Sequence, residues 1–580
     1  MKRRLFFAAA FAVFSTVLLC FGYHFRYVEQ LQMFLWDKGY LLSNLGVPAG
    51  FSAITSDLIA QSYGIPVLGP VLMSALLVIM VILTANILRK SRGDDSFLIL
   101  SLLPAFLALT DVLDINFSHS GTVAQTLMLS AMALVVSIKN GEKRFIATLV
   151  STAVVFWLGG PAAMVFALCM FLLELAWNIQ GAIKYLVPVI LVPVFAWISY
   201  SAGLVPDIRQ TLLPGFFFHY LDKIPAIHYL SWMSVPVVMA LNAVFRGEKR
   251  DRTPAANTMV LQSCLVVIAA VLPLVSQNKA LNVFKAADTM ARNKDWEKIK
   301  ELYRKNQEST SPALINIVNL ALAETGSLGE ALFRYSQFSV DGILPNKKLD
   351  MASTSVGSDL YWSMGMAGLS QRMAFEEDMY AYGIHNPRAI QRLVQTNLVY
   401  GAYDVAQKYL NLLERCPAYR GWAKRQSRFL YDDEAVEADE ELSGIRRCLP
   451  DTTSLGEIFG LGMDLRNIIH LNPRRRQGIQ YLEALFLLDK DMNSMLAMLD
   501  EFYGTEALPS LPTPLQEAVV LVANGNGMSE LTSRYGVDYS VKKRFYAFTK
   551  ALNTGNGLQD FADTFWYYAF ITNPKDNDDE

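Results

Sequence analysis

The feature that most constrains this chain is a series of nine apolar segments in the first half of its 580 residues. Most of them approach the ~20 apolar residues that a helix needs to cross a bilayer, and two are short. The segments run approximately over residues 4–23, 66–88, 96–113, 121–138, 145–159, 161–178, 185–203, 229–245 and 258–276. We therefore expect a polytopic transmembrane helical domain, with about nine spans, over residues 1–278.

Basic residues are distributed unequally between the loops that join these segments. With the N-terminus inside, fourteen Lys and Arg residues fall on the cytoplasmic side and four on the opposite side. The cytoplasmic set is Lys2, Arg3, Arg4, Arg89, Lys90, Arg92, Lys139, Lys143, Arg144, Lys184, Arg246, Lys249, Arg250 and Arg252. The opposite set is Arg26, Lys38, Arg209 and Lys223. Because cytoplasmic loops carry the excess of basic residues, this bias and an odd number of spans predict a bacterial inner-membrane protein with a periplasmic domain over residues 279–580.

The two halves of the chain also differ in charge. With 52% hydrophobic and 18% charged residues, the whole chain is too apolar for a single soluble protein. Residues 1–278 hold 18 Lys plus Arg against 13 Asp plus Glu, a net of +5, which leaves 33 against 40, a net of −7, for the rest. A mildly acidic second half argues against a nucleic-acid partner, which would require a basic face.

The N-terminal segment bears on whether the chain is cleaved, and the cysteines bear on whether it holds a metal or a disulfide. Residues 4–23 are long enough to span a bilayer, and Leu19 is not the small residue that lipoprotein processing at Cys20 would need, so we expect an uncleaved first span. The five cysteines show no metal-binding spacing. In an oxidising compartment Cys416 and Cys448 would either form a disulfide or remain two separately buried thiols.

Two loops on the predicted outer side are too long for simple turns. Residues 24–65 are expected to lie on the membrane surface, with short helices over residues 27–38 and 54–63 separated by a Gly- and Pro-containing break. Residues 205–228 form the second long loop, and its aromatic residues suggest packing at the level of the lipid headgroups.

From Asn278 onward, helical periodicity is frequent and strand signals are poor, so the second half is predicted to be all-α. Helix pairs are expected around turns at Asp295, Gly326, Gly401 and Asp489. Residues 280–415 resemble degenerate tetratricopeptide-like repeats, in which helix pairs stack because one pair cannot bury its own apolar face. The resemblance depends on small and large residues at Ala286, Trp296, Ala321, Leu328, Ala331, Ala402 and Ala406.

Polar residues gather in the predicted outer loops of the first half. The histidines there are His24, His119, His219 and His228, and the acids are Glu29, Asp37, Asp57, Asp111, Asp114, Asp207 and Asp222. Carboxylates and imidazoles of this kind can bind a divalent metal or act as a general base, and Arg26 or Arg209 could meet a phosphate. The alternative, which the position at span ends favours, is that they are interfacial and capping groups.

One acid, Glu174, lies near the inner end of the sixth apolar segment, where an ionised carboxylate is costly. It is expected either to have a partner or a function, or to extend to the cytoplasmic surface, and we favour the last of these. Aromatic runs in the second half, such as Phe565 to Tyr568, would line a peptide or glycan groove or, as we favour, pack in helix cores.

The first half is similar in plan to GT-C glycosyltransferases that use polyprenyl-phosphate-linked sugars. The shared features are a first span, a long outer loop with surface helices, acids in the first two outer loops and a series of hairpin spans. The resemblance implies a catalytic or metal-binding role, with a divalent metal as cofactor, for Asp37 or Asp57 and for Asp111 with Asp114 and the neighbouring His119. Taken whole, the chain resembles a family of bacterial polytopic membrane proteins of unknown function with a C-terminal helical domain, which implies no activity.

Two functional hypotheses follow. The leading one is an inner-membrane protein that displays a periplasmic helical-repeat domain as an interaction scaffold in cell-envelope assembly, because about 300 residues are predicted outside without a catalytic motif. Its partners would be the lipid bilayer and envelope proteins or glycans. The alternative is a GT-C-like transferase acting at the outer face of the membrane.

Overall fold

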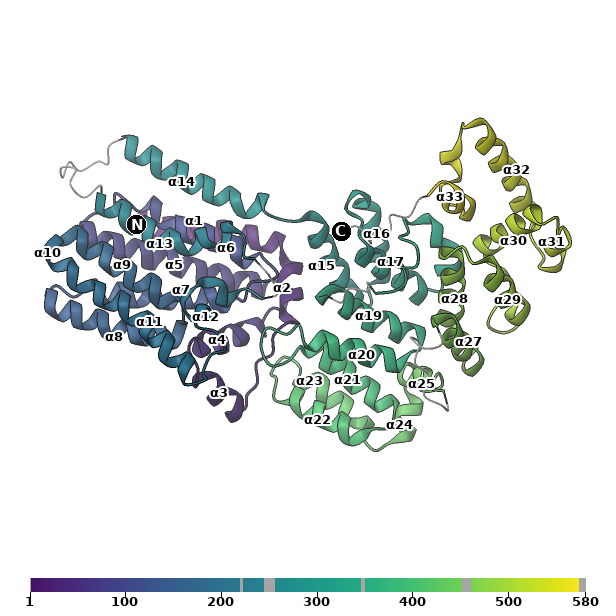
Figure 1. The fold of residues 1–580 in the computed structure, drawn as a ribbon, viewed down its shortest axis with the longest axis horizontal. Coiled ribbons are helices and arrows are strands. Elements are labelled where there is room, and N and C mark those ends of the chain that lie inside the picture. The colour runs from purple at the N-terminus through teal and green to yellow at the C-terminus, as the bar shows by residue number, and fades with distance from the viewer. Residues whose placement is uncertain (1, 220–222, 245–255, 346–349, 451–459, 573–580) are drawn as a thin grey trace. The chain divides into compact units, whose positions relative to one another are not determined.

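The fold of the computed structural model is all-helical, as predicted. The structure describes residues 2–219, 223–244, 256–345, 350–450 and 460–572 (Figure 1). Every regular element in these ranges is a helix, and only isolated β-bridges occur beside them. The chain divides into two compact units. The first comprises Met1–Asn278 with two short segments from further along the chain, Tyr382–Ile384 and Arg415–Arg420, and the second comprises the remainder.

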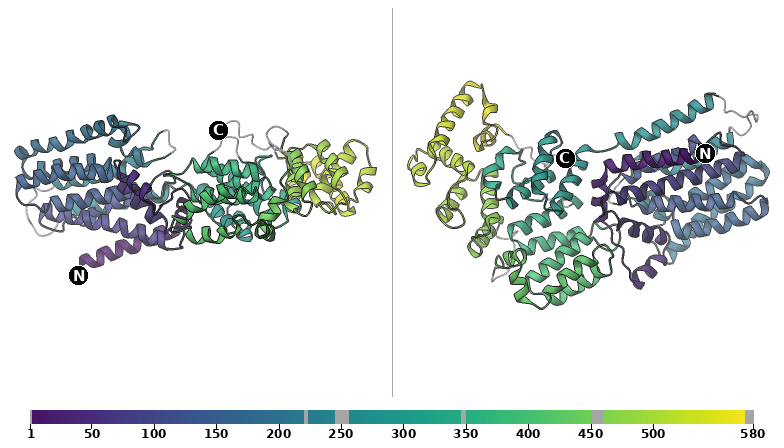
Figure 2. Two further views of the ribbon diagram at one scale, coloured as in Figure 1. Left: turned by 90° about the horizontal axis from the view of Figure 1, so that it is seen from below. Right: turned by 180° about the vertical axis from the view of Figure 1, so that it is seen from behind.

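The first unit is a bundle of long helices joined by short ones, which lie side by side in Figures 1 and 2. Its helices are α1 (Lys2–Cys20), α2 (Gly22–Glu29), α3 (Lys38–Leu45), α4 (Gly50–Ala60), α5 (Leu68–Arg92), η1 (Ile99–Leu102), α6 (Leu103–Val112), α7 (Ser120–Val135), α8 (Gly141–Gly159), α9 (Ala162–Trp177), α10 (Ile179–Ala182), η2 (Ile183–Tyr185), α11 (Leu186–Ser201), α12 (Ile208–Leu212), η3 (Pro214–Phe217), α13 (Ala226–Val244) and α14 (Ala256–Val275).

Four helices among the described residues are long and apolar enough to cross a membrane. They are α1, α5, the continuous stretch Ile179–Ser201 and α13. A fifth candidate is the pair Met259–Val275 and Lys279–Arg292, whose axes differ by 57°. Three further apolar helices of the first unit, Ile99–Val112, α7 and α9, are shorter, as is Pro312–Glu324 of the second unit. Each of the nine predicted segments coincides with a helix, but only these four or five have the length and composition of a span.

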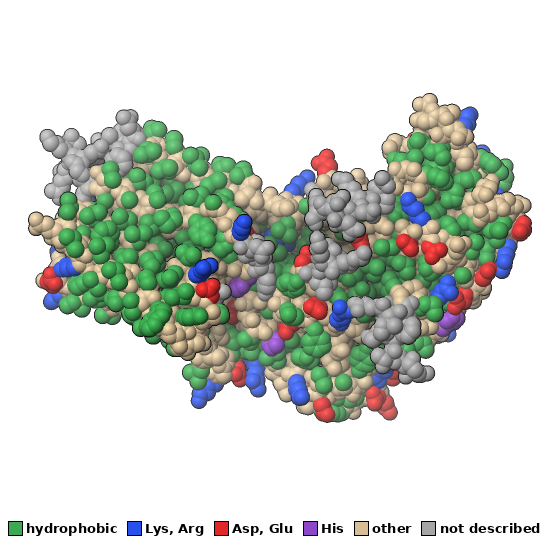
Figure 3. Space-filling view, viewed as in Figure 1, with side chains coloured by type: hydrophobic (Ala, Val, Ile, Leu, Met, Phe, Trp, Pro, Cys, Tyr) green, Lys and Arg blue, Asp and Glu red, His purple; other side chains and the backbone are tan. Residues whose placement is uncertain are grey.

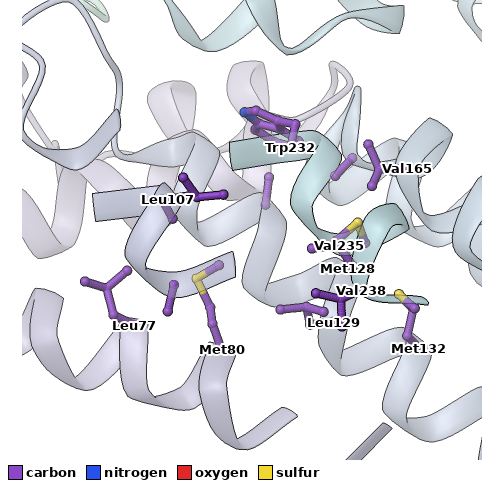
Figure 4. Packing of buried hydrophobic residues seen from close by; sticks show 14 of the residues in the cluster. Leu77, Met80, Leu107, Met128, Leu129, Met132, Val165, Trp232, Val235 and Val238 are labelled. Atoms are coloured by element: carbon purple, nitrogen blue, oxygen red, sulfur yellow. The ribbon is translucent and has the colours of Figure 1, made fainter. Parts of the chain in front are cut away.

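The core of the first unit is built from large apolar side chains of α5, α6, α7, α9 and α13, ten of which are labelled in Figure 4. Trp232 of α13 is 1% exposed, and its ring stacks on Phe217 with centroids 5.2 Å apart. The outer surface is apolar as well, and Figure 3 shows apolar side chains over much of the visible face of this unit. Ile146, Ile190 and Trp197 are each about 60% exposed, which a protein surrounded only by water rarely shows for so many neighbouring residues.

The predicted helix over residues 27–38 is wrong. Helix α2 ends at Glu29, and Asp37 begins a separate helix, α3, by accepting hydrogen bonds from the N–H groups of Gly39 (2.8 Å) and Tyr40 (3.2 Å). Between them the backbone is held by distant parts of the same unit. The N–H of Trp36 donates to the carbonyl of Arg415 (2.8 Å), and the carbonyl of Leu31 accepts from Tyr382 (2.7 Å). Tertiary hydrogen bonds therefore replace the helical ones that the local periodicity favoured.

The second surface helix is present but begins earlier than predicted, as α4 over Gly50–Ala60. Gly50 is required at its start, because a Cβ there would lie 1.7 Å from the carbonyl oxygen of Asn44. The glycine that the sequence indicated as part of a break therefore starts the helix through a close backbone approach.

Glu174 does not extend to the surface, so the favoured expectation for it is wrong. Its side chain is 5% exposed and forms a bidentate ion pair with Arg144, with the Nη2 atom 3.0 Å from Oε1 and 2.9 Å from Oε2. The Arg144 guanidinium also lies over the Trp177 ring, 4.5 Å from its centroid. The Arg144 guanidinium makes burial of the Glu174 carboxylate less costly than burial of an unpaired carboxylate would be.

All five cysteines are free thiols. Cys416 and Cys448 are both buried and do not form a disulfide, which is the second of the two expected outcomes. The Cys416 thiol donates to the side-chain oxygen of Gln61 (3.0 Å), and the Cys448 thiol donates to the carbonyl of Gly444 (3.3 Å).

The second unit consists of short helices in succession. They are α15 (Lys279–Arg292), α16 (Trp296–Lys305), η5 (Gln307–Ser309), α17 (Pro312–Glu324), α18 (Leu328–Ala331), η6 (Leu332–Arg334), α19 (Met351–Met364), α20 (Ala367–Asp378), α21 (Pro387–Val399), α22 (Tyr403–Glu414), α23 (Arg420–Gln426), η7 (Ser427–Phe429), α24 (Asp433–Ala438), α25 (Glu440–Arg446), α27 (Leu461–Leu471), α28 (Arg476–Leu488), α29 (Met492–Phe502), α30 (Thr513–Gly525), α31 (Glu530–Arg534), α32 (Tyr539–Thr554), η8 (Leu558–Phe561) and α33 (Phe565–Phe570).

The helix pairs predicted around Asp295, Gly326, Gly401 and Asp489 are present, although the second helix after Gly326 is short. The turns of these pairs share one backbone conformation. Two residues after the end of each first helix lies a residue with positive φ (Lys294, Gly326, Gly401 or Lys490), and the residue after it donates to a carbonyl five positions back at 2.8–3.0 Å. This is the Schellman arrangement, which satisfies the free carbonyls of a helix end. Whether the pairs form tetratricopeptide-like repeats stays a prediction.

Candidate functional site

The loops that were predicted to lie on the outer side meet at one end of the first unit. The N–H of His219 donates to the carbonyl of Asn116 (2.8 Å), which joins the loop before α13 to the loop after α6. Tyr63, which follows α4, donates or accepts a hydrogen bond with His119 (2.7 Å). The Tyr382 ring stacks on that of His219 with centroids 4.7 Å apart. This end, which we call the polar end, therefore brings together side chains that are distant in the sequence.

The loops predicted to be cytoplasmic meet through a different set of contacts. Arg3 donates to the side-chain oxygen of Asn86 (3.0 Å) and lies 3.7 Å from Asp95. Lys184 forms an ion pair with Glu142 (2.6 Å). Four of the predicted cytoplasmic residues, Arg246, Lys249, Arg250 and Arg252, lie outside the described residues. Among the described ones, predicted inner loops are thus linked to one another, as predicted outer loops are.

The central group of the polar end is His228, which lies between two carboxylates. Its Nδ1 is 2.8 Å from Oδ1 of Asp111, and its Nε2 is 3.0 Å from Oδ2 of Asp114. Asp111 is fully buried in the last turn of α6, and His228 lies in the first turn of α13. Since each nitrogen of the ring faces a carboxylate, both nitrogens donate, and the ring is a protonated imidazolium. Such a ring has no lone pair left for a metal ion or a substrate proton.

Asp114 is fixed further by the turn that follows α6. Its Oδ1 atom accepts hydrogen bonds from the backbone N–H (2.7 Å) and the side-chain amide (3.1 Å) of Asn116. Burial acts to raise the pKa of Asp114, but the hydrogen bonds from His228 and Asn116 outweigh it and hold the pKa below its usual value. Asp114 is therefore a charged carboxylate that locks the turn between α6 and α7 onto α13.

His119 and His24 converge on a single backbone oxygen. The carbonyl of Val112 lies 2.8 Å from Nε2 of His24 and 3.1 Å from Nε2 of His119. Both Nε2 atoms must donate to this acceptor, so in a neutral His119 the Nδ1 atom accepts from the Tyr63 hydroxyl. Burial lowers the pKa of His119 to about 4, which keeps the ring neutral. Because both ring nitrogens are hydrogen-bonded, His119 fixes the C-terminal end of α6 and has no free lone pair.

Asp57 and Asp37 belong to a second group around α3 and α4. The Tyr40 hydroxyl donates to Oδ2 of Asp57 (2.6 Å). Burial raises the pKa of Asp57 to about 7, although this hydrogen bond acts in the opposite direction. Asp37 caps α3 and forms an ion pair with Arg415 (2.8 Å). Asp57 is therefore a carboxyl group whose pKa lies near neutral pH, and Asp37 is a capping residue.

The other polar residues of the outer loops are engaged in local roles. Asp207 caps α12 by accepting from the N–H of Arg209 (2.9 Å), and Glu29 accepts a hydrogen bond from the Tyr419 hydroxyl (2.6 Å). Burial lowers the pKa of His219 to about 4. Asp222 lies outside the described residues.

The arrangement does not fit a divalent metal. Within the part of the chain that the structure describes, no three His, Cys, Asp or Glu residues are placed to hold a metal ion together. The carboxylates of Asp111 and Asp114 are already bonded to His228. The sequence indicated Asp111, Asp114 and His228 as members of one outer-loop group, but not that His228 lies between the two acids, nor that Tyr40 and Tyr63 are the partners of Asp57 and His119. Nothing in the sequence around these tyrosines signals a distant acid or imidazole.

Comparison with known proteins identifies the family to which the chain belongs. Neither the curated proteins nor the solved structures include a significant match to it. A family model, described as a family of unknown function, matches residues 1–572 and so covers both units. The chain therefore belongs to the DUF6057 family.

Proposed function

We propose that this protein is a bacterial inner-membrane protein with nine spans that displays its second unit in the periplasm as an interaction scaffold for cell-envelope assembly. The observation that carries the proposal is the polar end of the first unit. There the loops after α1, after α6 and before α13 meet one another and the segments Tyr382–Ile384 and Arg415–Arg420.

These contacts constrain the number of crossings. Hydrogen bonds such as Arg415 to Asp37 and Tyr419 to Glu29 cannot form across a bilayer, so both partners lie on the same side of it. An even number of spans must then separate residues 24–65 from the second unit. Eight of the nine predicted segments lie between them. With the N-terminus inside, that even number puts both regions outside, in agreement with the positive-inside bias.

The shorter apolar helices are compatible with this count. Ile99–Val112 has 14 residues and would extend only about 21 Å, less than the ~30 Å of hydrocarbon. Its residues from Leu103 to Val112 are all buried by neighbouring helices, so it need not face lipid over its full length. A short helix inside a bundle is tolerated through local thinning of the bilayer and through the longer helices around it.

The topology can be tested with two measurements on the full-length protein. Protease added to intact spheroplasts is expected to digest the second unit and leave the first, and a membrane-impermeant thiol reagent is expected to label a cysteine introduced at exposed Tyr431. Protection of both sites in intact cells, with exposure only after lysis, would reject the topology. The scaffold role requires that photo-crosslinkers on exposed faces of the second unit capture defined envelope proteins or glycans in living cells.

A second candidate function is a GT-C-like transfer of a lipid-linked sugar, and the observation that favours it is Asp57. A buried carboxyl group whose pKa is about 7 has the property required of a general acid or base at neutral pH. The internal bonding of Asp111, Asp114 and His119 argues against their participation. Under this hypothesis Asp57→Asn abolishes transfer, whereas the double variant Asp111→Asn, Asp114→Asn tests whether these two acids take part despite their pairing with His228. Full activity in both variants would eliminate the transferase.

A further inference from the structure

Helix α32 of the second unit carries an exposed stripe of alternating tyrosine and lysine. Tyr539, Lys543, Tyr546 and Lys550 follow one another at intervals of four, three and four residues, so they share one face of the helix. We call these four residues the α32 stripe. The opposite face is buried through Val541, Phe545, Phe548 and Ala551. Because that packing fixes the rotation of the helix, the stripe must point into solvent.

The two tyrosines are exposed to an unusual degree. Tyr539 is 80% exposed and Tyr546 is 67% exposed, more than any other tyrosine among the described residues. Exposed tyrosine is enriched where proteins bind one another, because it contributes a large apolar area and a hydroxyl at little conformational cost.

The charge of α32 is also uncompensated. Its sixteen residues include four basic ones and no acid. Arg544 is neutralised by Asp563 (2.5 Å), but Lys543 and Lys550 form no ion pair within the described residues. This is a strongly basic helix in a half of the chain whose net charge is −7. The α32 stripe therefore favours an acidic partner surface.

The second unit carries such a surface elsewhere, around α24 and α25. Five acids there are exposed, and we call them the acidic patch: Asp432, Asp433, Glu434, Glu437 and Glu440. Asp433 and Glu437 face Arg446 at 2.9 and 3.7 Å. The other three have no cationic partner among the described residues. Figure 1 shows α24 and α32 well apart in the second unit, so one copy cannot satisfy its own stripe with its own patch.

We propose that the second unit associates with a second copy of itself, with the α32 stripe of one copy on the acidic patch of the next. The two surfaces match in charge, and complementary charge orients the two copies and speeds their association more than it increases their affinity. A stripe–patch contact made once between two copies is heterologous and builds chains or rings, whereas two reciprocal contacts about a two-fold axis close a dimer. Exposed ion pairs contribute at most about 1 kcal/mol each, so the contact is weak in solution. Anchoring in one membrane raises the effective concentration and would make it persist. The inference does not depend on which side of the membrane holds the second unit.

The test is a charge-swap experiment on the full-length protein in detergent. Light scattering and sedimentation are expected to show concentration-dependent association at about 50 mM salt that disappears at about 500 mM, because salt screens exposed charges. Lys543→Glu with Lys550→Glu should weaken association by roughly tenfold. Glu434→Lys with Glu440→Lys should do the same, and mixing the two variants should restore association through the matching pair of reversed surfaces. The matched control is Arg304→Glu with Arg425→Glu, which makes the same change in charge on exposed residues outside the stripe and the patch.

Each outcome decides the proposal. A wild-type protein that stays monomeric at every concentration overturns it. Association that persists in both charge-reversal variants overturns the proposal as well. So does association that is weakened by the stripe substitutions but not by the patch substitutions, because the stripe then binds a surface other than the acidic patch. Thiol reactivity of buried Cys448 checks that the variants remain folded. If the reversals unfold the second unit, the milder pair Lys543→Gln and Lys550→Gln must still weaken association, and failure to do so counts against the proposal.

Discussion

The two units place their buried charges differently. In the first unit they lie where helices end, as in the Arg144–Glu174 pair and the Asp111–His228–Asp114 group, and the middle of the bundle is filled by apolar side chains such as those in Figure 4. In the second unit a charged network runs through the core. A helix bundle with an apolar exterior has its polar surroundings only at its ends, whereas a unit with a polar exterior can bury charges deeply if each has a partner.

The core network of the second unit is centred on Arg388. Its Nη1 atom is 2.7 Å from Asp288, and its Nη2 atom is 2.6 Å from Asp359. Arg392 also pairs with Asp359 (2.7 Å), and Glu377 lies at the edge of the group, 3.9 Å from the Nε atom of Arg388. The closely paired side chains come from α15, α19 and α21, so the guanidinium of Arg388 links three helices of the second unit.

The largest effect is therefore expected from Arg388→Met. Removal of the guanidinium leaves Asp288 and Asp359 short of a buried partner, which should cost about 3–5 kcal/mol of stability. The readout is the reactivity of Cys448 in a variant without the other cysteines, because this buried thiol reports opening of the second unit alone. The control is Lys408→Met on the exposed surface, expected to change stability by less than about 0.5 kcal/mol. If Lys408→Met lost as much stability as Arg388→Met, the core network would not explain the effect of the Arg388 substitution.

His228→Ala tests the corresponding group in the first unit. Without the imidazolium, the carboxylates of Asp111 and Asp114 lose their shared cation, and we expect a loss of about 2–4 kcal/mol. Part of the cost is offset because Asp114 keeps its hydrogen bonds from Asn116. Reactivity of buried Cys169 measures opening of the first unit. In the triple variant with Asp111→Asn and Asp114→Asn, most of the loss should be recovered, since the uncompensated charges are then gone.

Much of the helical content follows from the sequence, whereas the partners of the candidate residues do not. The predicted helix pairs around Gly326 and Gly401 formed because periodicity and a left-handed turn residue are both local signals. The helix predicted over residues 27–38 failed because Trp36 and Leu31 bond to residues more than 300 positions away. The same distance hides the Tyr419–Glu29 contact. Local patterns specify where a helix forms, but the partner of a buried acid is a property of the tertiary fold.

The second unit should also show a pH dependence that originates at Glu377. This carboxyl group is buried, and burial raises its pKa to about 7 from an ordinary value near 4.5. Below pH 4.5 it is protonated in both states. Between about 4.5 and 7 only the folded state keeps the proton, so stability falls as pH rises, by up to about 3 kcal/mol above pH 7. Glu377→Gln should remove this part of the pH dependence.

The measurement is the midpoint of denaturation at pH 5 and at pH 8, read from Cys448 in both proteins. The wild type is expected to lose more stability than the variant over this interval, and parallel behaviour of the two would show that Glu377 does not titrate there. Asp114 of the first unit has a lowered pKa and should add no loss of stability in the same range.

The smallest effect is expected at Asp37, where a capping bond and an exposed ion pair can be separated. Asp37→Asn keeps an N-cap oxygen for Gly39 and Tyr40 and loses only the charge opposite Arg415. Because that pair is exposed, we expect a change of at most about 0.5 kcal/mol. Asp37→Ala also removes the cap and should cost about 1 kcal/mol. Equal losses in the two variants would mean that the charge matters more than the cap, and that the polar end of the first unit depends on ion pairing as strongly as the core of the second.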